Sequence, residues 1–213
     1  MKLGLLGGTF NPIHLAHLRI AEEALVASGL DQVLFIPAAD PPHKPLAGDV
    51  PFALRFEMVQ RAISGNPAFG ISDIEARRSG KSYTVDTLTA LRAERPADEL
   101  FFIIGSDSFL ELGLWHQYEE IFSLASLIVV ERPGKEIKAP LHQLPEAVRC
   151  QFNQETDNLL RHSSGKSISF VTGTHLDISS SRLRQYIATR RSIRYLVPPE
   201  VETYIAQKGL YLE

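Results

Sequence analysis

The sequence has little of several features that would assign a protein to a class at once. Its 213 residues contain a single cysteine, Cys150, and a single tryptophan. One cysteine cannot form an intramolecular disulfide and fits a reducing compartment. No apolar run approaches the ~18–20 residues of a membrane span, and the apolar start is broken at Gly7-Gly8, too early for a signal sequence. We therefore expect a cytoplasmic protein with no membrane partner.

An excess of positive charge is also missing. Lys and Arg number 22 against 25 Asp and Glu, which gives a formal net charge of −3. This excludes a broadly basic nucleic-acid binder, so we expect no nucleic-acid partner. A local polyanion site is still compatible with the small net charge. Four arginines near the C-terminus are interpreted as a solvated basic face, with a homo-oligomer contact or a share in a phosphate site as alternatives: Arg182, Arg190, Arg191 and Arg194.

Short apolar runs alternate along the chain with stretches of helical period. Strands are expected at residues 2–6, 33–36, 69–74, 100–104, 127–130 and 167–172, and helices at 18–25, 52–63, 85–94, 180–189 and 198–208. This order predicts an α/β fold: a Rossmann-like, doubly wound parallel sheet in a single domain, 1–213, with a small C-terminal helical portion. The proline-rich residues 38–51 are expected to form a long loop, and the polar residues 136–166 are interpreted as a peripheral insertion, mostly helical.

The turn after the first expected strand carries the strongest chemical signal. It reads Gly7-Gly8-Thr9-Phe10-Asn11-Pro12-Ile13-His14-Leu15-Ala16-His17. It is neither the dinucleotide fingerprint nor a Walker phosphate loop. Its two glycines let backbone amides approach an anion, and His14 and His17 share a face where a helix begins. Asn11 and Pro12 would cap and begin that helix, unless it starts only near Leu15. A phosphate site is favoured over a zinc pair, which needs three or four protein ligands.

This turn resembles the GGTFDPxHxGH signature of the nucleotidyltransferase superfamily that carries a (T/H)xGH motif. Further segments, in order, are similar to those of the bacterial nicotinate-nucleotide adenylyltransferases: Pro41-Pro42-His43-Lys44, Ser82-Tyr83-Thr84-Val85-Asp86-Thr87-Leu88, Ile103-Ile104-Gly105-Ser106-Asp107, Trp115, Arg132-Pro133 and Ile178-Ser179-Ser180-Ser181-Arg182-Leu183-Arg184. The resemblance runs from Met1 to Leu212, and residues 136–166 are the part without a motif.

The resemblance implies transfer of AMP from ATP to nicotinate mononucleotide, giving deamido-NAD and pyrophosphate by direct in-line attack. Mg²⁺ would be carried by ATP, with no metal held by direct side-chain ligation. The catalytic residues implied are His14, His17 and Arg184. Those implied for ATP are Gly7, Gly8, Thr9, Phe10, His14, His17, Lys44, Gly105, Ser106, Asp107, Ile178, Ser180, Ser181 and Arg184. Those implied for nicotinate mononucleotide are Thr9, His43, Lys44, Tyr83, Thr84, Asp107, Trp115, His116 and Arg132.

Each of these groups has an implied task. The imidazoles, Lys44, Arg132 and Arg184 would supply cations and hydrogen-bond donors to the phosphates. Ser180, Ser181 and Arg184 would cap a helix N-terminus onto the β- and γ-phosphates. Trp115 would stack on the pyridinium ring, since an aromatic face attracts a flat cation.

The chain departs from the family pattern at two positions, with Asn11 where Asp is usual and Ala16 where Gly is usual. Asn keeps the capping ability of Asp, and the extra methyl of Ala16 is expected to change the KM for ATP by less than about tenfold. Three alternatives stay open: another transferase of the superfamily (dual specificity for nicotinate and nicotinamide mononucleotides, or a different phosphate acceptor), a nucleotide-binding protein without activity, and a metal hydrolase built on the His pair.

Overall fold

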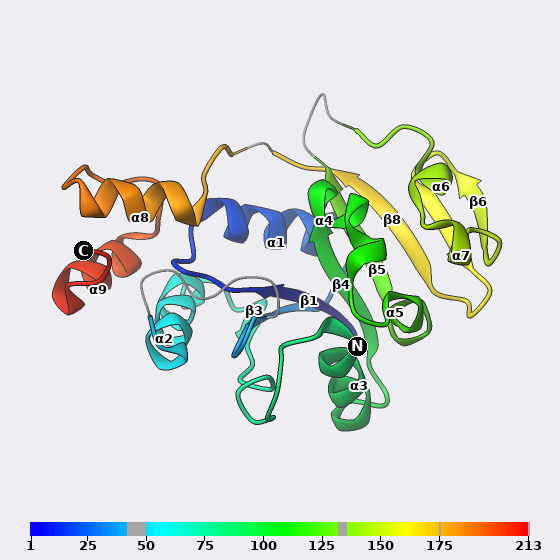
Figure 1. Cartoon of the computed structure of the whole chain (residues 1–213), viewed down its shortest axis with the longest axis horizontal. Helices are drawn as coiled ribbons and strands as arrows, with labels where there is room; N and C mark the ends of the chain where they lie inside the picture. Colours follow the sequence, from blue (N-terminus) through cyan, green and yellow to red (C-terminus); the bar gives the residue numbers. More distant parts are fainter. Residues whose placement is uncertain (42–49, 132–135, 175, 213) are drawn as a thin grey trace. The chain divides into compact units, whose positions relative to one another are not determined.

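The computed structural model of the chain describes residues 1–41, 50–131, 136–174 and 176–212. Strands and helices alternate along it, as the apolar pattern predicts (Figure 1). The strands are β1 (Lys2–Gly8), β2 (Gln32–Pro37), β3 (Phe69–Ile71), β4 (Glu99–Gly105), β5 (Ser126–Glu131), β6 (Phe152–Thr156), β7 (Leu159–His162) and β8 (Ser167–Thr172). The helices are α1 (Leu15–Ala27), α2 (Phe52–Ile63), α3 (Thr84–Glu94), α4 (Ser106–Leu110), α5 (Tyr118–Leu124), α6 (Pro140–Gln143), α7 (Glu146–Arg149), α8 (Ser180–Ala188) and α9 (Pro199–Lys208), with a 3₁₀ turn η2 (Leu112–Leu114).

The strands form an eight-stranded sheet in the order β3-β2-β1-β4-β5-β8-β7-β6. Strand β1 pairs in parallel with β4, β4 with β5, and β5 with β8. The sheet is therefore mostly parallel and doubly wound, as predicted. The chain order reverses between β1 and β4, which is where sheets of this kind bind ligands, at the carboxyl ends of the strands.

Residues 136–166 differ from the expectation. They were expected to be mostly helical, but they contain the hairpin β6–β7, and β7 pairs antiparallel with β8. Helices α6 and α7 are only one turn each. Strand β6 (Phe-Asn-Gln-Glu-Thr) is exposed after its first residue, so it lacks the apolar run that identifies a buried strand. The segment extends the edge of the sheet with two antiparallel strands.

The chain divides into two compact units. The first consists of Met1–Leu6, Ile20–Val33 and Tyr83–His175, and the second of Gly7–Arg19, Leu34–Ser82 and Leu176–Glu213. Three of the five boundaries fall inside β1, α1 and β2. That the whole chain makes a single domain stays a prediction.

The core of the first unit lies along its parallel strands. All six residues of β5 are buried, as expected for a strand covered on both faces. Leu3, Leu100 and Ile128 are almost fully inaccessible to solvent. Helix α3 packs against α5.

In the second unit, α2 packs against α9, and Figure 1 shows the two side by side. The core includes Phe35, Met58 and Ile205. Gly209 ends α9 in the left-handed conformation, with φ 60°, as its position after the helix predicts. None of the helices in the described ranges is long and apolar enough to cross a membrane.

Candidate functional site

The turn after β1, Thr9–Pro12, belongs to the second unit, and its carbonyl groups are bonded to side chains of the same unit. The Thr9 carbonyl accepts a hydrogen bond from Arg55 Nη1 at 2.7 Å, and the Pro12 carbonyl accepts one from Ser180 Oγ at 2.8 Å. The Asn11 carbonyl accepts one from Arg184 Nη1 at 2.7 Å. With these acceptors bonded to the protein, the turn presents less negative charge to an incoming anion. This arrangement suits a phosphate.

Gly8 and Phe10 shape the inner side of this turn. The Phe10 ring is 2% exposed, and its centroid lies 5.1 Å from that of His17 and 5.9 Å from that of Phe35. A Cβ on Gly8 would lie 3.0 Å from the Phe10 ring, so the glycine is needed for close packing. Because the Phe10 side chain is buried in this way, its part in ATP binding would fall to the backbone.

His14 and His17 come together, although α1 begins only at Leu15, the later of the two starts expected, so that Asn11 and Pro12 do not begin the helix. Their rings are stacked, with centroids 3.7 Å apart and 22° between the planes. The backbone N–H of His14 donates to His17 Nδ1 at 3.2 Å. Since Nδ1 of His17 accepts, its proton in the neutral ring resides on Nε2, which can donate to a phosphate oxygen. His14 Nδ1 is buried without a hydrogen-bond partner among the described residues.

Burial makes both imidazoles weak bases. Desolvation lowers the pKa of His14 to about 4, because a charged ring is unfavourable in the interior. The pKa of His17 lies well below its usual 6.5 for the same reason, and the neighbouring His14 lowers it further. Of the two expected tasks, supplying cations and supplying hydrogen-bond donors, the lowered pKa values favour the second. Both imidazoles are neutral hydrogen-bond donors near pH 7.

Helix α8 carries the other residues of this unit that were predicted to bind phosphate. It begins at Ser180, as expected, and its N-cap is Ser179, which accepts from the Arg182 amide at 3.3 Å. Ser180 bonds the turn, and Arg184 Nη2 donates to Ser181 Oγ at 3.3 Å. Ile178 is half-buried just before the cap. The start of α8 and the turn are thus joined by side-chain hydrogen bonds that the sequence spacing does not predict.

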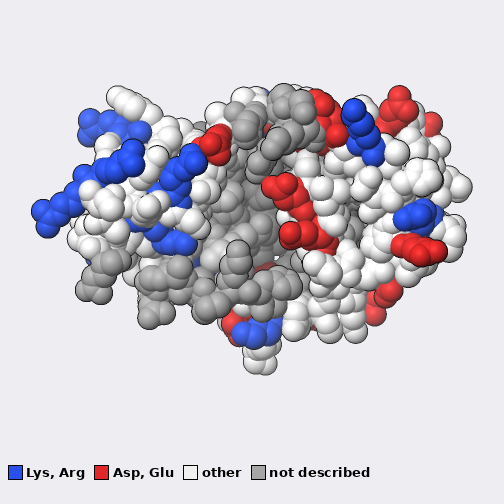
Figure 2. All heavy atoms as spheres, turned by 45° about the horizontal axis from the view of Figure 1, so that its top comes forward, with Lys and Arg blue, Asp and Glu red and all other residues white. Residues whose placement is uncertain are grey.

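The basic residues around α8 are exposed, as the solvated-face interpretation expects. Figure 2 shows basic side chains gathered over the end of the second unit that carries α8, where the exposed residues are Arg182, Arg190, Arg191 and Arg194. Arg182 pairs with Asp177 at 3.2 Å, and the Arg191 guanidinium lies 4.1 Å from the Tyr186 ring centroid. These contacts leave the face hydrated rather than buried.

In the first unit, the residues expected for the pyridine nucleotide form an aromatic group. The Tyr83 and His116 rings are 4.2 Å apart at 31°. Trp115 is only partly buried and meets Phe102 edge-on at 6.1 Å, so it is not a core residue. Thr84 is the first residue of α3, where the helix dipole favours a carboxylate. Asp86 lies in the first turn of α3.

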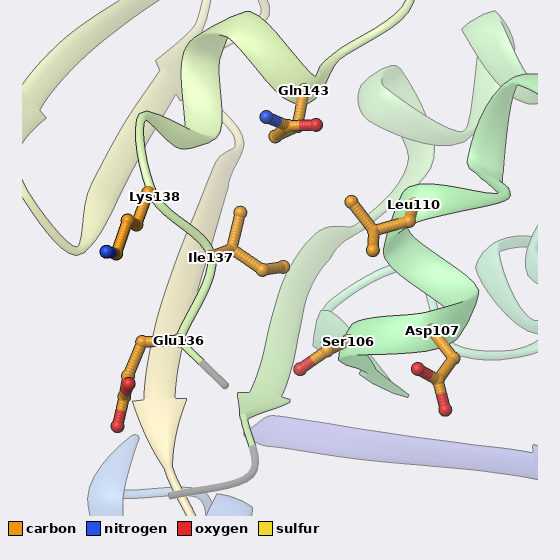
Figure 3. A pocket seen from close by; sticks show the side chains of 7 residues that line it. All are labelled: Ser106, Asp107, Leu110, Glu136, Ile137, Lys138 and Gln143. Atoms are coloured by element: carbon orange, nitrogen blue, oxygen red, sulfur yellow. The ribbon is translucent and has the colours of Figure 1, made fainter. Parts of the chain in front are cut away.

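Gly105, Ser106 and Asp107 stand where β4 gives way to α4, with Gly105 as the N-cap. Ser106 and Asp107 line a pocket of about 360 Å³ within the first unit, together with Leu110, Glu136, Ile137, Lys138 and Gln143. In Figure 3, Leu110 and Ile137 point toward one another across it, while Ser106 and Asp107 lie at the start of α4. Ser106 Oγ is buried there without a hydrogen-bond partner among the described residues.

Three predicted site residues lie outside the described residues: His43, Lys44 and Arg132. Within the described ranges, no group of three or more His, Cys, Asp or Glu side chains could hold a metal ion.

The sequence analysis did not predict two residues that bond the turn Thr9–Pro12, Arg55 and Tyr211. Arg55 could have been found, because it lies on the apolar stripe of α2 with Met58, Val59 and Ala62 and is fully buried. Tyr211 donates its hydroxyl to Asn11 Oδ1 at 2.6 Å, and no spacing rule links positions 200 residues apart.

Comparison with known proteins agrees with this geometry. A family model described as cytidylyltransferase-like matches residues 5–186. The fold and the turn after β1 are thus those of a nucleotidyltransferase of this class. A protein of Trichlorobacter lovleyi named "Probable nicotinate-nucleotide adenylyltransferase" is 77% identical over 99% of both chains, and one of the same name from Pelobacter propionicus is 57% identical over 100% of this chain and 99% of its own. The chain belongs to the nicotinate-nucleotide adenylyltransferase family.

Solved structures share the fold at lower identity. The nicotinic acid mononucleotide adenylyltransferase of Plasmodium falciparum, complexed with NaAD, aligns with a TM-score of 0.77 at 21% identity and covers 100% of this chain and 99% of its own. The same protein complexed with APC gives a TM-score of 0.74 at 20% identity, again over 100% and 99% of the two chains.

Proposed function

We propose that this chain transfers the adenylyl group of ATP to nicotinate mononucleotide, forming deamido-NAD and releasing pyrophosphate. The observation that carries the proposal is the turn Thr9–Pro12, whose carbonyls are bonded away and which leads directly into two stacked, neutral imidazoles. Family membership supplies the substrates that such an anion site would serve.

The chemistry needs positioning and charge stabilisation rather than a covalent intermediate. A phosphate oxygen of the mononucleotide attacks the α-phosphorus of ATP, a new P–O bond forms, and the bond to the β-phosphate oxygen breaks so that pyrophosphate leaves in line. His17 Nε2–H would donate to charge that develops on the α- and β-phosphates. Arg184, half-buried and bonded to the turn, would hold the leaving phosphates with Ser180 and Ser181.

The acceptor is assigned to the aromatic group of the first unit. The N–H and hydroxyl of Thr84, at the start of α3, would receive the nicotinate carboxylate, and Trp115 would stack on the pyridinium. Tyr83 and His116 would border the same ligand. Asp107 would bind a ribose hydroxyl, and Gly105 and Ser106 would contact the nucleotide. His43, Lys44 and Arg132 are assigned to the phosphates on the resemblance alone.

Magnesium is proposed to enter with ATP, because phosphate oxygens are the hard ligands that this ion prefers. When bound, it would neutralise charge on the triphosphate and on the departing pyrophosphate. We also propose that the protein works in the cytoplasm.

A single assay tests the proposal. Purified protein is given MgATP and, separately, nicotinate mononucleotide, nicotinamide mononucleotide, phosphopantetheine and a polyol phosphate, and both pyrophosphate and the adenylylated product are measured. We expect kcat/KM for the nicotinate form to exceed that for the nicotinamide form by roughly tenfold or more. Thr84→Val should shrink this preference, whereas Thr89→Val, further along α3, should not. Equal rates with both mononucleotides would indicate dual specificity, and product from another acceptor alone would overturn the assignment.

A further inference from the structure

The penultimate described residue of the chain contacts the turn that follows the first strand. Tyr211 lies just after α9 and is 8% exposed, with its backbone in the left-handed region at φ 65°. Its hydroxyl donates to Asn11 Oδ1 at 2.6 Å. Asn11 is itself only 4% exposed, so this hydrogen bond lies in the interior. Tyr211 therefore links the segment after α9 to the turn Thr9–Pro12.

The same turn is held from two other directions. Arg184 of α8 bonds the carbonyl of Asn11, the residue whose side chain Tyr211 bonds, and Arg55 of α2 bonds the carbonyl of Thr9. The Tyr211 hydroxyl also lies in the electrostatic field of both guanidinium groups. Burial raises the pKa of Tyr211 strongly, while Arg184 and Arg55 oppose that rise, so the group stays a neutral donor.

Resting on the function proposed above, we propose that Tyr211 is a positioning residue for the phosphate site: it fixes the side chain of Asn11 and, together with Arg184 and Arg55, holds Thr9–Pro12 in the form that receives the phosphates of ATP. The residue acts through Asn11 and touches no substrate. Its effect is assigned to the binding and transfer steps, because the Asn11 side chain that it fixes belongs to the turn whose carbonyls are bonded to Arg55, Arg184 and Ser180.

The hydroxyl can be removed without emptying the core. Tyr211→Phe keeps the buried ring and deletes the donor. Tyr204→Phe is the matched control: Tyr204 is also buried in the C-terminal part of the chain, but its ring packs against the Arg61 guanidinium at 4.7 Å. We expect Tyr211→Phe to lower kcat/KM for ATP by about tenfold, and Tyr204→Phe to change it less than twofold.

A double-mutant cycle separates positioning from a general loss of stability. In the Asn11→Ala background the acceptor is gone, so Tyr211→Phe should cost less than twofold there. In the Asn11→Asp background an acceptor remains, so Tyr211→Phe should again cost about tenfold. Thermal unfolding of each variant is measured alongside. Equal costs in all three backgrounds, or a lower melting temperature with unchanged kcat/KM, would overturn the proposal.

The test also stands apart from the proposed function. MgATP binding by calorimetry and hydrogen exchange of the amides at residues 9–13 are measured on wild-type protein and on Tyr211→Phe. If the wild type makes no dinucleotide, the function fails, but weaker MgATP binding and faster exchange in Tyr211→Phe would still support the positioning role. Unchanged binding and exchange would overturn that role even in an active enzyme.

Discussion

Arg55 Nη1 donates to the carbonyl oxygen of Thr9 at 2.7 Å, from a side chain that is fully inaccessible to solvent. Its Nε donates to the Val50 carbonyl at 3.2 Å, while Nη2 has no hydrogen-bond partner among the described residues. Desolvation lowers the pKa of this guanidinium, and the charge of Glu75 opposes the change. Burying a cation is costly. The two hydrogen bonds of the Arg55 guanidinium, which join α2 to Thr9 and Val50, offset part of this cost.

Arg55→Lys should therefore destabilise the fold. An ammonium keeps the charge but cannot reach two separate carbonyls with the fixed geometry of a guanidinium, so one buried acceptor is left unsatisfied. The expected loss in the free energy of unfolding is about 1–3 kcal/mol, measured by urea titration. Arg61→Lys serves as the control on the same helix, since Arg61 is exposed and pairs with Glu57. Equal losses at both positions would contradict the role given to Arg55.

Gly8→Ala should weaken ATP binding as well as stability. The added methyl would lie 3.0 Å from the Phe10 ring, which is held between His17 and Phe35 and cannot move freely. Crowding of this kind costs about 1–3 kcal/mol and displaces the ring against which His17 lies. Gly65→Ala is the control, because a Cβ there meets nothing within 4 Å. The KM for ATP and the melting temperature are compared. If Gly8→Ala has the wild-type KM for ATP and the wild-type melting temperature, the Phe10 ring moves to accommodate the methyl group and the prediction is wrong.

The fold was readable from the sequence where burial leaves a pattern. Strands such as β5 are covered on both faces and appear as unbroken apolar runs, and α2 was predicted with its observed ends because its apolar stripe is continuous. The hairpin β6–β7 was not predicted, because β6 is polar and its strand character comes from pairing with β7. Pairing of that kind is a tertiary property that a local pattern does not contain.

The candidate site was predictable in part for the same reason. The spacing of His14 and His17, three residues apart, predicted that the two rings lie close together. The sequence did not predict that the two imidazoles are neutral, since their low pKa values come from desolvation by the surrounding residues. The bond from Tyr211 to Asn11 joins two ends of the chain, so only the folded protein shows it.

His17→Ala should reduce kcat by about 10²-fold or more, because a donor aimed at developing charge in a transition state is worth that much. The melting temperature is measured alongside, so that a loss of stability is separated from the loss of rate. Pyrophosphate release at saturating substrates gives kcat, and circular dichroism checks the fold. The comparison variant is His116→Ala, which changes an exposed histidine beside Tyr83. It should lower kcat less than His17→Ala does. A His17→Ala enzyme within threefold of the wild-type kcat would rule out the catalytic role.

Acid should destabilise the protein in a manner traceable to His14. The ring is 5% exposed and its pKa falls from 6.5 to about 4 on folding. Between these values the unfolded chain binds a proton that the folded chain does not, so the free energy of unfolding rises with pH across this window. The contribution is fully present above pH 6.5 and is lost as the pH falls toward 4. At pH 5 the loss from this residue amounts to about 2 kcal/mol.

His14→Gln removes the titrating group and should flatten this part of the curve. Urea unfolding at pH 7.5 and pH 5 is measured for the wild type, His14→Gln and the exposed His116→Gln. The difference in slope between the wild type and His14→Gln reports His14 together with its effect on the neighbouring His17. The wild type and His116→Gln should lose about 2 kcal/mol more than His14→Gln between the two pH values. Parallel losses in all three would mean that the His14 ring gains its proton as readily in the folded protein as in the unfolded chain.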